Sequence, residues 1–298
     1  MDIAITGSSG LIGTRLVAAL ESEGHRVLRI VRRASDRPTA DEAIWDPSAG
    51  AIDATALEGL DAVVHLAGEG IAERRWTPEQ KARISDSRSA GTTLIANTLA
   101  SLTRPPRRLL SGSAIGIYGD TAARPTDESS PVGTGFLPDV CLAWEAAAQP
   151  AIDAGISTAF LRTGIVLSTD GGALAKQLPF FKAGLGGRSG SGRQYQSWIA
   201  IDDEIASIVW LLSSDITGPV NLTAPNPVTN AEFAKALGAA LHRPTTVIPM
   251  IGPRLLYGRE LADTLLLESQ RILPAKLESG GYQFRFPELD AALAHVLR

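Results

Sequence analysis

The chain has 298 residues, of which 44% are hydrophobic and 20% charged, so it can bury one large core, or a core with a small lobe. Its net charge of −4 and isoelectric point near 5.6 argue against a nucleic-acid or membrane surface, because both require a basic face. The single cysteine, Cys141, excludes an internal disulfide and fits a reducing compartment, so we expect a cytoplasmic protein.

The chain opens with a strand, a glycine-rich turn and a helix. Apolar residues 3–5 precede Gly7, Gly10 and Gly13, and residues 14–20 have a helical pattern. Glycine lets a backbone approach a ligand closely, and a helix N-terminus presents N–H groups to an anion. This order is typical of a dinucleotide pyrophosphate site, although the spacing is Gly-x-x-Gly-x-x-Gly instead of the more familiar Gly-x-Gly-x-x-Gly. The alternative is a plain glycine-rich turn.

The second predicted strand, residues 25–31, ends at two arginines. An NAD enzyme places an acidic residue here, about 20 residues beyond the glycines, on the ribose 2′-hydroxyl. This chain has Arg32 and Arg33 instead. A guanidinium suits the 2′-phosphate of NADP, which an acid would repel. The pattern therefore favours NADP over NAD. The alternative is that the two arginines are only solvent-exposed residues of a loop.

Strands and helices alternate through the rest of the chain, which predicts an α/β fold with a doubly wound parallel sheet of the Rossmann type. Residues 168–200 look loop-rich. Beyond a junction marked by Pro249 and Pro253, we expect a small α+β C-terminal lobe with a helix at 255–267, an alternating strand at 282–286 and a last helix near 287–297. The predicted domains are 1–247, with substrate-lobe segments within about 168–247, and 248–298. We see no signal peptide, membrane-spanning run or metal-ligand spacing.

Several motifs resemble those of the extended short-chain dehydrogenase/reductases, which bind NAD(P) and include nucleotide-sugar epimerases. They are the glycine motif, His65-Leu66-Ala67-Gly68 and Tyr118-Gly119. One subgroup resembles this chain over nearly its whole length: the epimerase family proteins related to the human short-chain dehydrogenase/reductase 39U member. The motifs that carry this likeness are Trp45-Asp46-Pro47, Ser87-Arg88, Trp144-Glu145, Gln270-Arg271-x-x-Pro274, Gly281-Tyr282-x-Phe284 and residues 65–69, 113–119, 162–167, 190–194, 198–203 and 221–225.

The resemblance implies a cofactor shell for NADP(H). Its cofactor-binding residues would be Gly7, Gly10, Leu11, Ile12, Gly13, Arg32, Leu66, Ala67, Gly68, Arg88 and Arg162. The glycines would hold the pyrophosphate, Arg32 the 2′-phosphate, and Leu66 and Ala67 the adenosine side. From the residues alone, Arg88 is only an arginine on a helix. The resemblance also implies a small appended domain in the last fifty or so residues.

The chain departs from this superfamily at the catalytic residues. The superfamily carries Tyr-x-x-x-Lys, with a glutamate four residues after the lysine. Counting back from Glu145 puts Cys141 at the lysine position and Leu137 at the tyrosine position, and neither can do that work. The serine survives as Ser111 or Ser113, and we take Ser113 as the catalytic candidate. Tyr118 is the reserve acid, with a packing tyrosine as the alternative.

The remaining candidates lie in the second half of the chain. Arg193 and Gln194 occupy a glycine loop where related enzymes contact substrate, and an arginine there could bind phosphate or carboxylate. The alternative is an exposed loop residue. Asp202 and Asp203 precede an apolar helical run, so we interpret them as helix caps.

These observations predict an NADP-binding oxidoreductase or epimerase that acts on a small polar metabolite. Two alternatives stay open. One is a non-catalytic, NADP-dependent binding or regulatory protein of the cell-division-inhibitor kind. The other is catalysis by an atypical residue set that includes water, Ser113 or Tyr118. The expected partner is a small-molecule substrate, with neither nucleic acid nor membrane, and a homodimer is one open possibility for the assembly.

Overall fold

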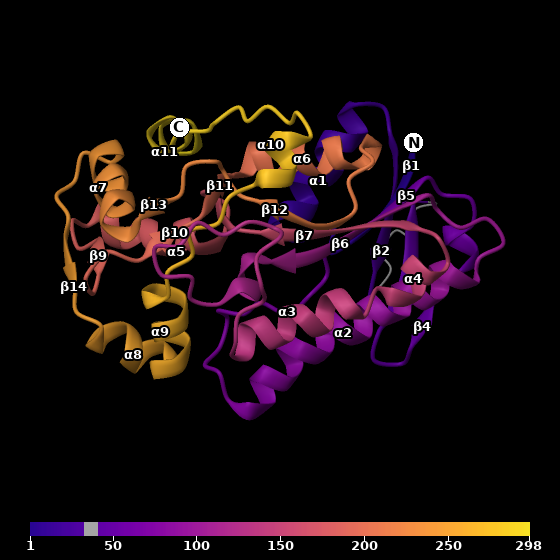
Figure 1. The fold of residues 1–298 in the computed structure, drawn as a ribbon, viewed down its shortest axis with the longest axis horizontal. Coiled ribbons are helices and arrows are strands. Elements are labelled where there is room, and N and C mark those ends of the chain that lie inside the picture. Colours follow the sequence, from indigo (N-terminus) through magenta and orange to yellow (C-terminus); the bar gives the residue numbers. More distant parts are fainter. Residues whose placement is uncertain (33–40) are drawn as a thin grey trace.

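A large, mainly parallel sheet runs through the centre of the molecule (Figure 1). The computed structural model describes residues 1–32 and 41–298, so Arg33 lies outside the described residues. Within those ranges eight strands pair in the order β12-β7-β6-β5-β1-β2-β3-β4, and only β3 and β4 pair antiparallel. Their bounds are β1 Asp2–Thr6, β2 Arg26–Val31, β3 Glu42–Asp46, β4 Ala51–Ile52, β5 Ala62–His65, β6 Arg108–Ala114, β7 Ser157–Thr163 and β12 Gly218–Leu222.

Helices cover both faces of the sheet, as a doubly wound fold requires (Figure 1). Helices α1 (Leu11–Ser22) and α6 (Ile201–Ser213) pack on one face, against Ile3 and Ile5 of β1. On the other face lie α2 (Pro78–Ser101), α3 (Phe136–Ala146) and α4 (Gln149–Asp153). Ala4 points to that second face, because successive strand side chains alternate between faces. The predicted Rossmann-type α/β fold is confirmed.

The region beyond β7 builds a second, smaller core. Short strand pairs β8–β11, β10–β13 and β9–β14 surround it together with α5 and α7. Their bounds are β8 Ile165–Leu167, α5 Gly172–Lys182, β9 Gly187–Ser189, β10 Tyr195–Gln196, β11 Trp198–Ala200, β13 Val228–Thr229, α7 Asn230–Ala240 and β14 Thr246–Ile248. Helix α5 lies inside the segment predicted as loop-rich. It begins at a glycine pair and contains Pro179, and because both residue types disfavour helices, the sequence pattern did not predict it.

The C-terminal segment is helical, and the strand predicted at residues 282–286 is wrong. Its helices are α8 Ile251–Tyr257, α9 Arg259–Leu267, α10 Ala275–Ser279 and α11 Leu289–Val296. The backbone N–H groups of Arg285 and Phe286 donate to the Asp203 carboxylate, each at 2.8 Å, instead of to a neighbouring strand. Tyr282 donates to the Asp203 backbone oxygen at 3.1 Å.

The same contacts correct the interpretation of Asp203 as a helix cap. Helix α6 begins at Ile201, after Ala200, and Asp203 lies buried in its first turn. Its carboxylate therefore anchors the C-terminal segment. Its neighbour Asp202, also in that turn, lies 3.2 Å from Nε2 of His295. None of the described helices combines the length and apolar character needed to cross a membrane.

Candidate functional site

The turn between β1 and α1 is closed by backbone contacts that leave no room for side chains at two of its glycines. Gly7 has a φ of +69°, and a Cβ there would lie 2.9 Å from the Ala67 nitrogen. A Cβ on Gly13 would lie 2.1 Å from the Gly7 oxygen. The Gly10 N–H donates to that same oxygen at 3.0 Å. Glycine is therefore required at positions 7 and 13 by the fold of the turn itself.

Gly10 is different, because the space around it is open. A Cβ there would meet only the Gly7 oxygen, at 3.3 Å. Gly10 is also the residue immediately before α1, and it offers no side chain to cap the helix. The first turn of α1 contains no acidic residue either. The N–H groups of Leu11, Ile12 and Gly13, which lack acceptors within a helix, are thus available to an anion.

A buried threonine–histidine pair positions the end of β5 beside this turn. Thr6 Oγ1 accepts from the N–H groups of Leu66 and Ala67, at 3.1 and 3.2 Å. It also lies within hydrogen-bonding distance of Nδ1 of His65, at 2.7 Å. Burial lowers the pKa of His65 to about 4, so the ring is neutral at physiological pH. Residues 66–68 are therefore held against the glycine turn, and His65 has a structural place in β5.

Arg32 and Arg88 approach the same edge of the sheet from two sides. Arg32 is exposed and follows β2, two residues beyond Ile30, which is paired with Thr6. Arg88, on α2, donates from Nη1 to the backbone oxygens of Glu69 and Ile84, at 2.9 and 3.0 Å. Its guanidinium also lies 4.8 Å from the centroid of the Trp144 ring.

Leu137 and Cys141 face the segment that follows Ser113. A Cβ on Gly116 would lie 3.5 Å from Leu137 Cβ and 4.0 Å from Cys141 Sγ. Burial raises the pKa of the Cys141 thiol to about 12, so it stays protonated. An apolar side chain and a neutral thiol thus occupy the positions where the superfamily has its phenol and its ammonium.

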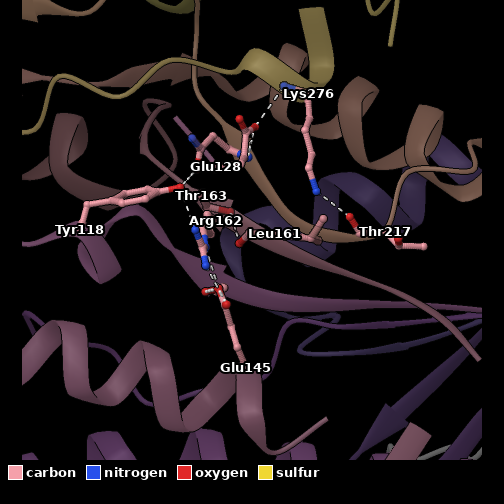
Figure 2. A network of polar contacts seen from close by, with 10 residues as sticks. Tyr118, Glu128, Glu145, Leu161, Arg162, Thr163, Thr217 and Lys276 are labelled. Carbon is pink, nitrogen blue, oxygen red and sulfur yellow. Dashed lines mark hydrogen bonds and ion pairs between the residues drawn. The ribbon is translucent and has the colours of Figure 1, made fainter. Parts of the chain in front are cut away.

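Ser113, at the end of β6, is hydrogen-bonded to a network of polar contacts whose members Glu145, Arg162 and Tyr118 are labelled in Figure 2. Its hydroxyl donates to Glu145 Oε1 at 2.7 Å. Arg162 binds both oxygens of Glu145, Nε to Oε1 at 2.8 Å and Nη2 to Oε2 at 2.9 Å. Its third donor, Nη1, reaches the hydroxyl of Tyr118 at 2.8 Å. Arg162 is 6% exposed, so its charge is balanced inside the protein by Glu145.

Tyr118 carries the network on to the C-terminal segment. Its hydroxyl donates to Asn221 Oδ1 at 2.8 Å, and burial raises its pKa. Asn221 in turn donates from Nδ2 to the Leu273 oxygen at 2.9 Å and from its backbone to Glu128 at 3.0 Å. Burial also raises the pKa of Glu128. The Tyr118 hydroxyl is thus fully engaged within the protein, and the residue is only 2% exposed.

Sequence reasoning missed the roles of Arg162, Asn221 and Glu128 in this network. The one available signal was Glu145, which the motif count had already located next to Trp144. A charged residue beside a large apolar one such as Trp144 needs a partner if it is buried, and the structure shows that this partner is Arg162.

The two predicted substrate residues have different surroundings. Gln194 is buried, and its side-chain amide donates to the Ser189 and Leu266 oxygens at 3.0 and 2.7 Å. Arg193 is exposed and lines an open cavity of about 640 Å³. A second cavity, of about 470 Å³, lies at the C-terminal end of α6, beside residues that precede β12. This cavity therefore lies at the amino-terminal ends of the parallel strands, whereas the glycine turn lies at their carboxyl-terminal ends.

Comparisons with known proteins identify the family to which the chain belongs. The model of the NAD dependent epimerase/dehydratase family matches residues 3–137, and that of a domain of unknown function, DUF1731, matches residues 248–296. The chain is 45% identical over 296 residues to an epimerase family protein of Mycobacterium bovis, covering 99% of this chain and 97% of that protein. It is 35% identical over 302 residues to the human epimerase family protein SDR39U1, covering the whole of both. The crystal structure of human SDR39U1 (isoform 2) with NADPH superposes with a TM-score of 0.89 at 34% identity, covering 99% of each chain.

Proposed function

The chain belongs to the epimerase family that includes human SDR39U1, and we propose that it binds NADP(H) and acts as an oxidoreductase or epimerase on a small polar metabolite. The observation that carries the proposal is the glycine turn. Gly7 and Gly13 are required by its backbone, whereas Gly10 and the uncapped start of α1 leave an anion-binding surface open. The cytoplasm suits a chain whose one cysteine is buried.

The residues around the turn fit a dinucleotide phosphate. The N–H groups of Leu11, Ile12 and Gly13 would hold the pyrophosphate, and residues 66–68 would line the adenosine side. Arg32 supports NADPH over NADH, because an exposed guanidinium at the end of β2 suits a 2′-phosphate. When bound, NADPH supplies a hydride.

Arg88 would provide the positive charge that the lysine provides elsewhere in the superfamily. Its guanidinium is held by two backbone oxygens and by Trp144, on the side of α3 that carries Cys141. We propose that it contacts the cofactor next to Gly68, since a Cβ on Gly68 would lie 3.4 Å from its Cζ. Arg162 would support the cofactor pocket through Glu145, because Glu145 and Tyr118 already engage its donors.

Ser113 would handle the proton at the substrate oxygen. Its hydroxyl donates to Glu145, so in the oxidation direction, with NADP⁺ as the hydride acceptor, it can accept the proton of a substrate hydroxyl while its own proton moves toward the carboxylate. Reduction by NADPH would run the same transfers in reverse. Leu137 and Cys141 stand at the positions of the usual tyrosine and lysine, so Ser113 would have to work without that pair. We therefore expect slow chemistry, since a well-placed acid or base contributes about 10²–10⁴ in rate.

Leu137 and Cys141 favour a second candidate function, an NADP-dependent binding or regulatory protein without catalysis. The test that separates the two is NADPH consumption followed at 340 nm with a panel of carbonyl compounds and nucleotide sugars. Substrate-dependent loss of absorbance supports the enzyme. Tight NADPH binding without turnover of any panel member supports the regulatory protein.

A further inference from the structure

The open cavity beside Arg193 lies where three distant segments meet. Its lining comes from the loop after Tyr118, the glycine loop after β9, and the helices α8 and α9. The lining includes the side chains of Asp120, Ser191, Arg193, Met250 and Leu267. Gln270 attaches this region to the Ser113 segment, because its side-chain amide donates to the oxygens of Ile115 and Gly119, at 3.2 and 3.3 Å.

A buried serine fixes the walls of the cavity relative to one another. The Ser269 hydroxyl donates to the Ala122 oxygen and accepts from the Tyr195 N–H at 2.9 Å. Its backbone N–H donates to Asp120 Oδ1 at 3.2 Å, and its oxygen accepts from Thr121 at 2.7 Å. All three segments are therefore connected before any ligand arrives, which lowers the entropic cost of binding.

Among the arginines in and around this cavity, Arg193 differs because its guanidinium has no partner among the described residues. Arg254 is paired with Asp263 at 2.7 Å, and Arg271 stacks on Tyr195 at 4.9 Å. Arg188 donates to the Gly190 oxygen at 2.5 Å. In contrast, the Arg193 guanidinium makes no hydrogen bond or ion pair with any described residue, and only its backbone N–H is engaged, with Ser191 Oγ at 3.3 Å.

Asp120 supplies the opposite charge on the same wall. Its Oδ1 accepts from the N–H groups of Ala122 and Ser269, at 2.8 and 3.2 Å, which fixes the side chain. Its Oδ2 accepts no hydrogen bond from the part of the chain that the structure describes. A fixed carboxylate oxygen is an acceptor for hydroxyl groups, and Met250 and Leu267 add apolar surface nearby.

We propose that this cavity binds an anionic polyol, with its acidic group on Arg193 and its hydroxyls on Asp120 and Ser191. Met250 and Leu267 would contact the C–H face of such a ligand. The inference rests on the proposed function, because it makes this cavity the distal part of the substrate site that begins at Ser113. The acidic group can be a carboxylate or a phosphate, since a guanidinium binds both.

The test compares probes that share a polyol body and differ in charge. Binding of D-glucuronate, D-glucose 6-phosphate and neutral D-glucose would be measured by saturation-transfer difference NMR on the full chain. A charge-assisted contact predicts that at least one charged probe binds about tenfold more tightly than glucose. The stronger of the two charged probes identifies the acidic group.

Matched variants assign the effect to the cavity. Arg193→Gln should reduce binding of the charged probe to the level of glucose, and Asp120→Asn should weaken all three probes. The control is Arg107→Gln, an exposed arginine just before β6 at the opposite edge of the sheet, which should change nothing. The inference is overturned if no charged probe saturates, if Arg193→Gln has no effect, or if Arg107→Gln has the same effect.

An NADPH titration on the same samples separates this inference from the proposed function. If the wild type binds NADPH but neither charged probe, only the inference about the cavity fails. If it binds a charged probe through Arg193 but not NADPH, the cofactor assignment fails and the cavity stands. Arg193→Gln should leave NADPH affinity unchanged, because Arg193 is outside the glycine turn.

Discussion

Glu145 and Arg162 form a two-point ion pair beneath Ser113, with nitrogen–oxygen distances of 2.8 and 2.9 Å. Both side chains are nearly buried, at 11% and 7% exposure. Removing one partner of such a pair leaves a buried charge without compensation, which costs about 3–5 kcal/mol. Glu145→Ala should therefore lower the free energy of unfolding by about that amount in urea titrations.

The control for this prediction is the exposed pair of Arg29 with Glu21, at 2.9 Å. Exposed ion pairs contribute about 0–1 kcal/mol, so Glu21→Ala should change stability by less than about 1 kcal/mol. Equal effects of the two substitutions would contradict the structural place given to Glu145.

The buried carboxyl of Glu204 predicts a pH-dependent stability. Burial raises its pKa from 4.5 to about 8, and Thr163 donates to it at 2.9 Å. The folded state therefore binds a proton that the unfolded state releases between pH 4.5 and 8, so this group destabilises the fold as pH rises through that window. Glu204→Gln removes the titration but keeps an acceptor for Thr163.

The stability of Glu204→Gln relative to wild type should increase by up to about 1.4 kcal/mol per pH unit between pH 5 and 8. Denaturant titrations of both proteins at three pH values measure the slope. A constant difference across the window would show that Glu204 is ionised in the folded protein.

The glycine turn predicts different effects on stability for two substitutions. Gly10→Val should leave the fold intact, because a Cβ there meets only one oxygen at 3.3 Å, but it should abolish NADPH binding by filling the open space. Gly13→Ala should also lower the melting temperature, because its Cβ would lie 2.1 Å from the Gly7 oxygen. Circular dichroism and a cofactor titration on each variant test this. Undiminished binding by Gly10→Val would place the cofactor elsewhere.

Measuring reaction rate and stability on the same variants should distinguish the role of Ser113 from that of Tyr118. Ser113→Ala should slow any substrate-dependent NADPH consumption at least tenfold, since it removes the proton-handling hydroxyl. Tyr118→Phe loses contacts to Arg162 and Asn221, so it should lower stability by about 1–3 kcal/mol with little change in rate. A large rate loss in Tyr118→Phe at unchanged stability would instead make the tyrosine the acid.

Local patterns in the sequence were enough to predict the sheet and the glycine turn. Apolar runs and the glycine spacing are read from neighbouring residues, and β1, α1 and β2 lie where they were predicted. The alternation of Tyr282, Phe284 and Phe286 suggested a strand for the same reason. This strand prediction fails because the backbone N–H groups of Arg285 and Phe286 donate to Asp203 on α6 and not to a neighbouring strand. Asp203 is about 80 residues away in the chain, so no local pattern includes it.

The candidate site was less predictable because its partners are far apart in the chain. Glu145 and Arg162 meet only after α3 and β7 have packed, and Tyr118 reaches Asn221 across 103 residues. Arg193 was predicted from its loop, but the cavity that gives it a role requires α8, α9 and the loop after Tyr118 to come together.

The most direct test of the central claim is the comparison of NADPH and NADH binding by calorimetry, for wild type and Arg32→Asp. A charge-assisted contact with the 2′-phosphate contributes about 1.5–3 kcal/mol, so wild type should prefer NADPH by about one to two orders of magnitude. Arg32→Asp should reverse that preference, because a carboxylate repels the 2′-phosphate and accepts from a 2′-hydroxyl. Equal or tighter binding of NADH by the wild type would contradict the account.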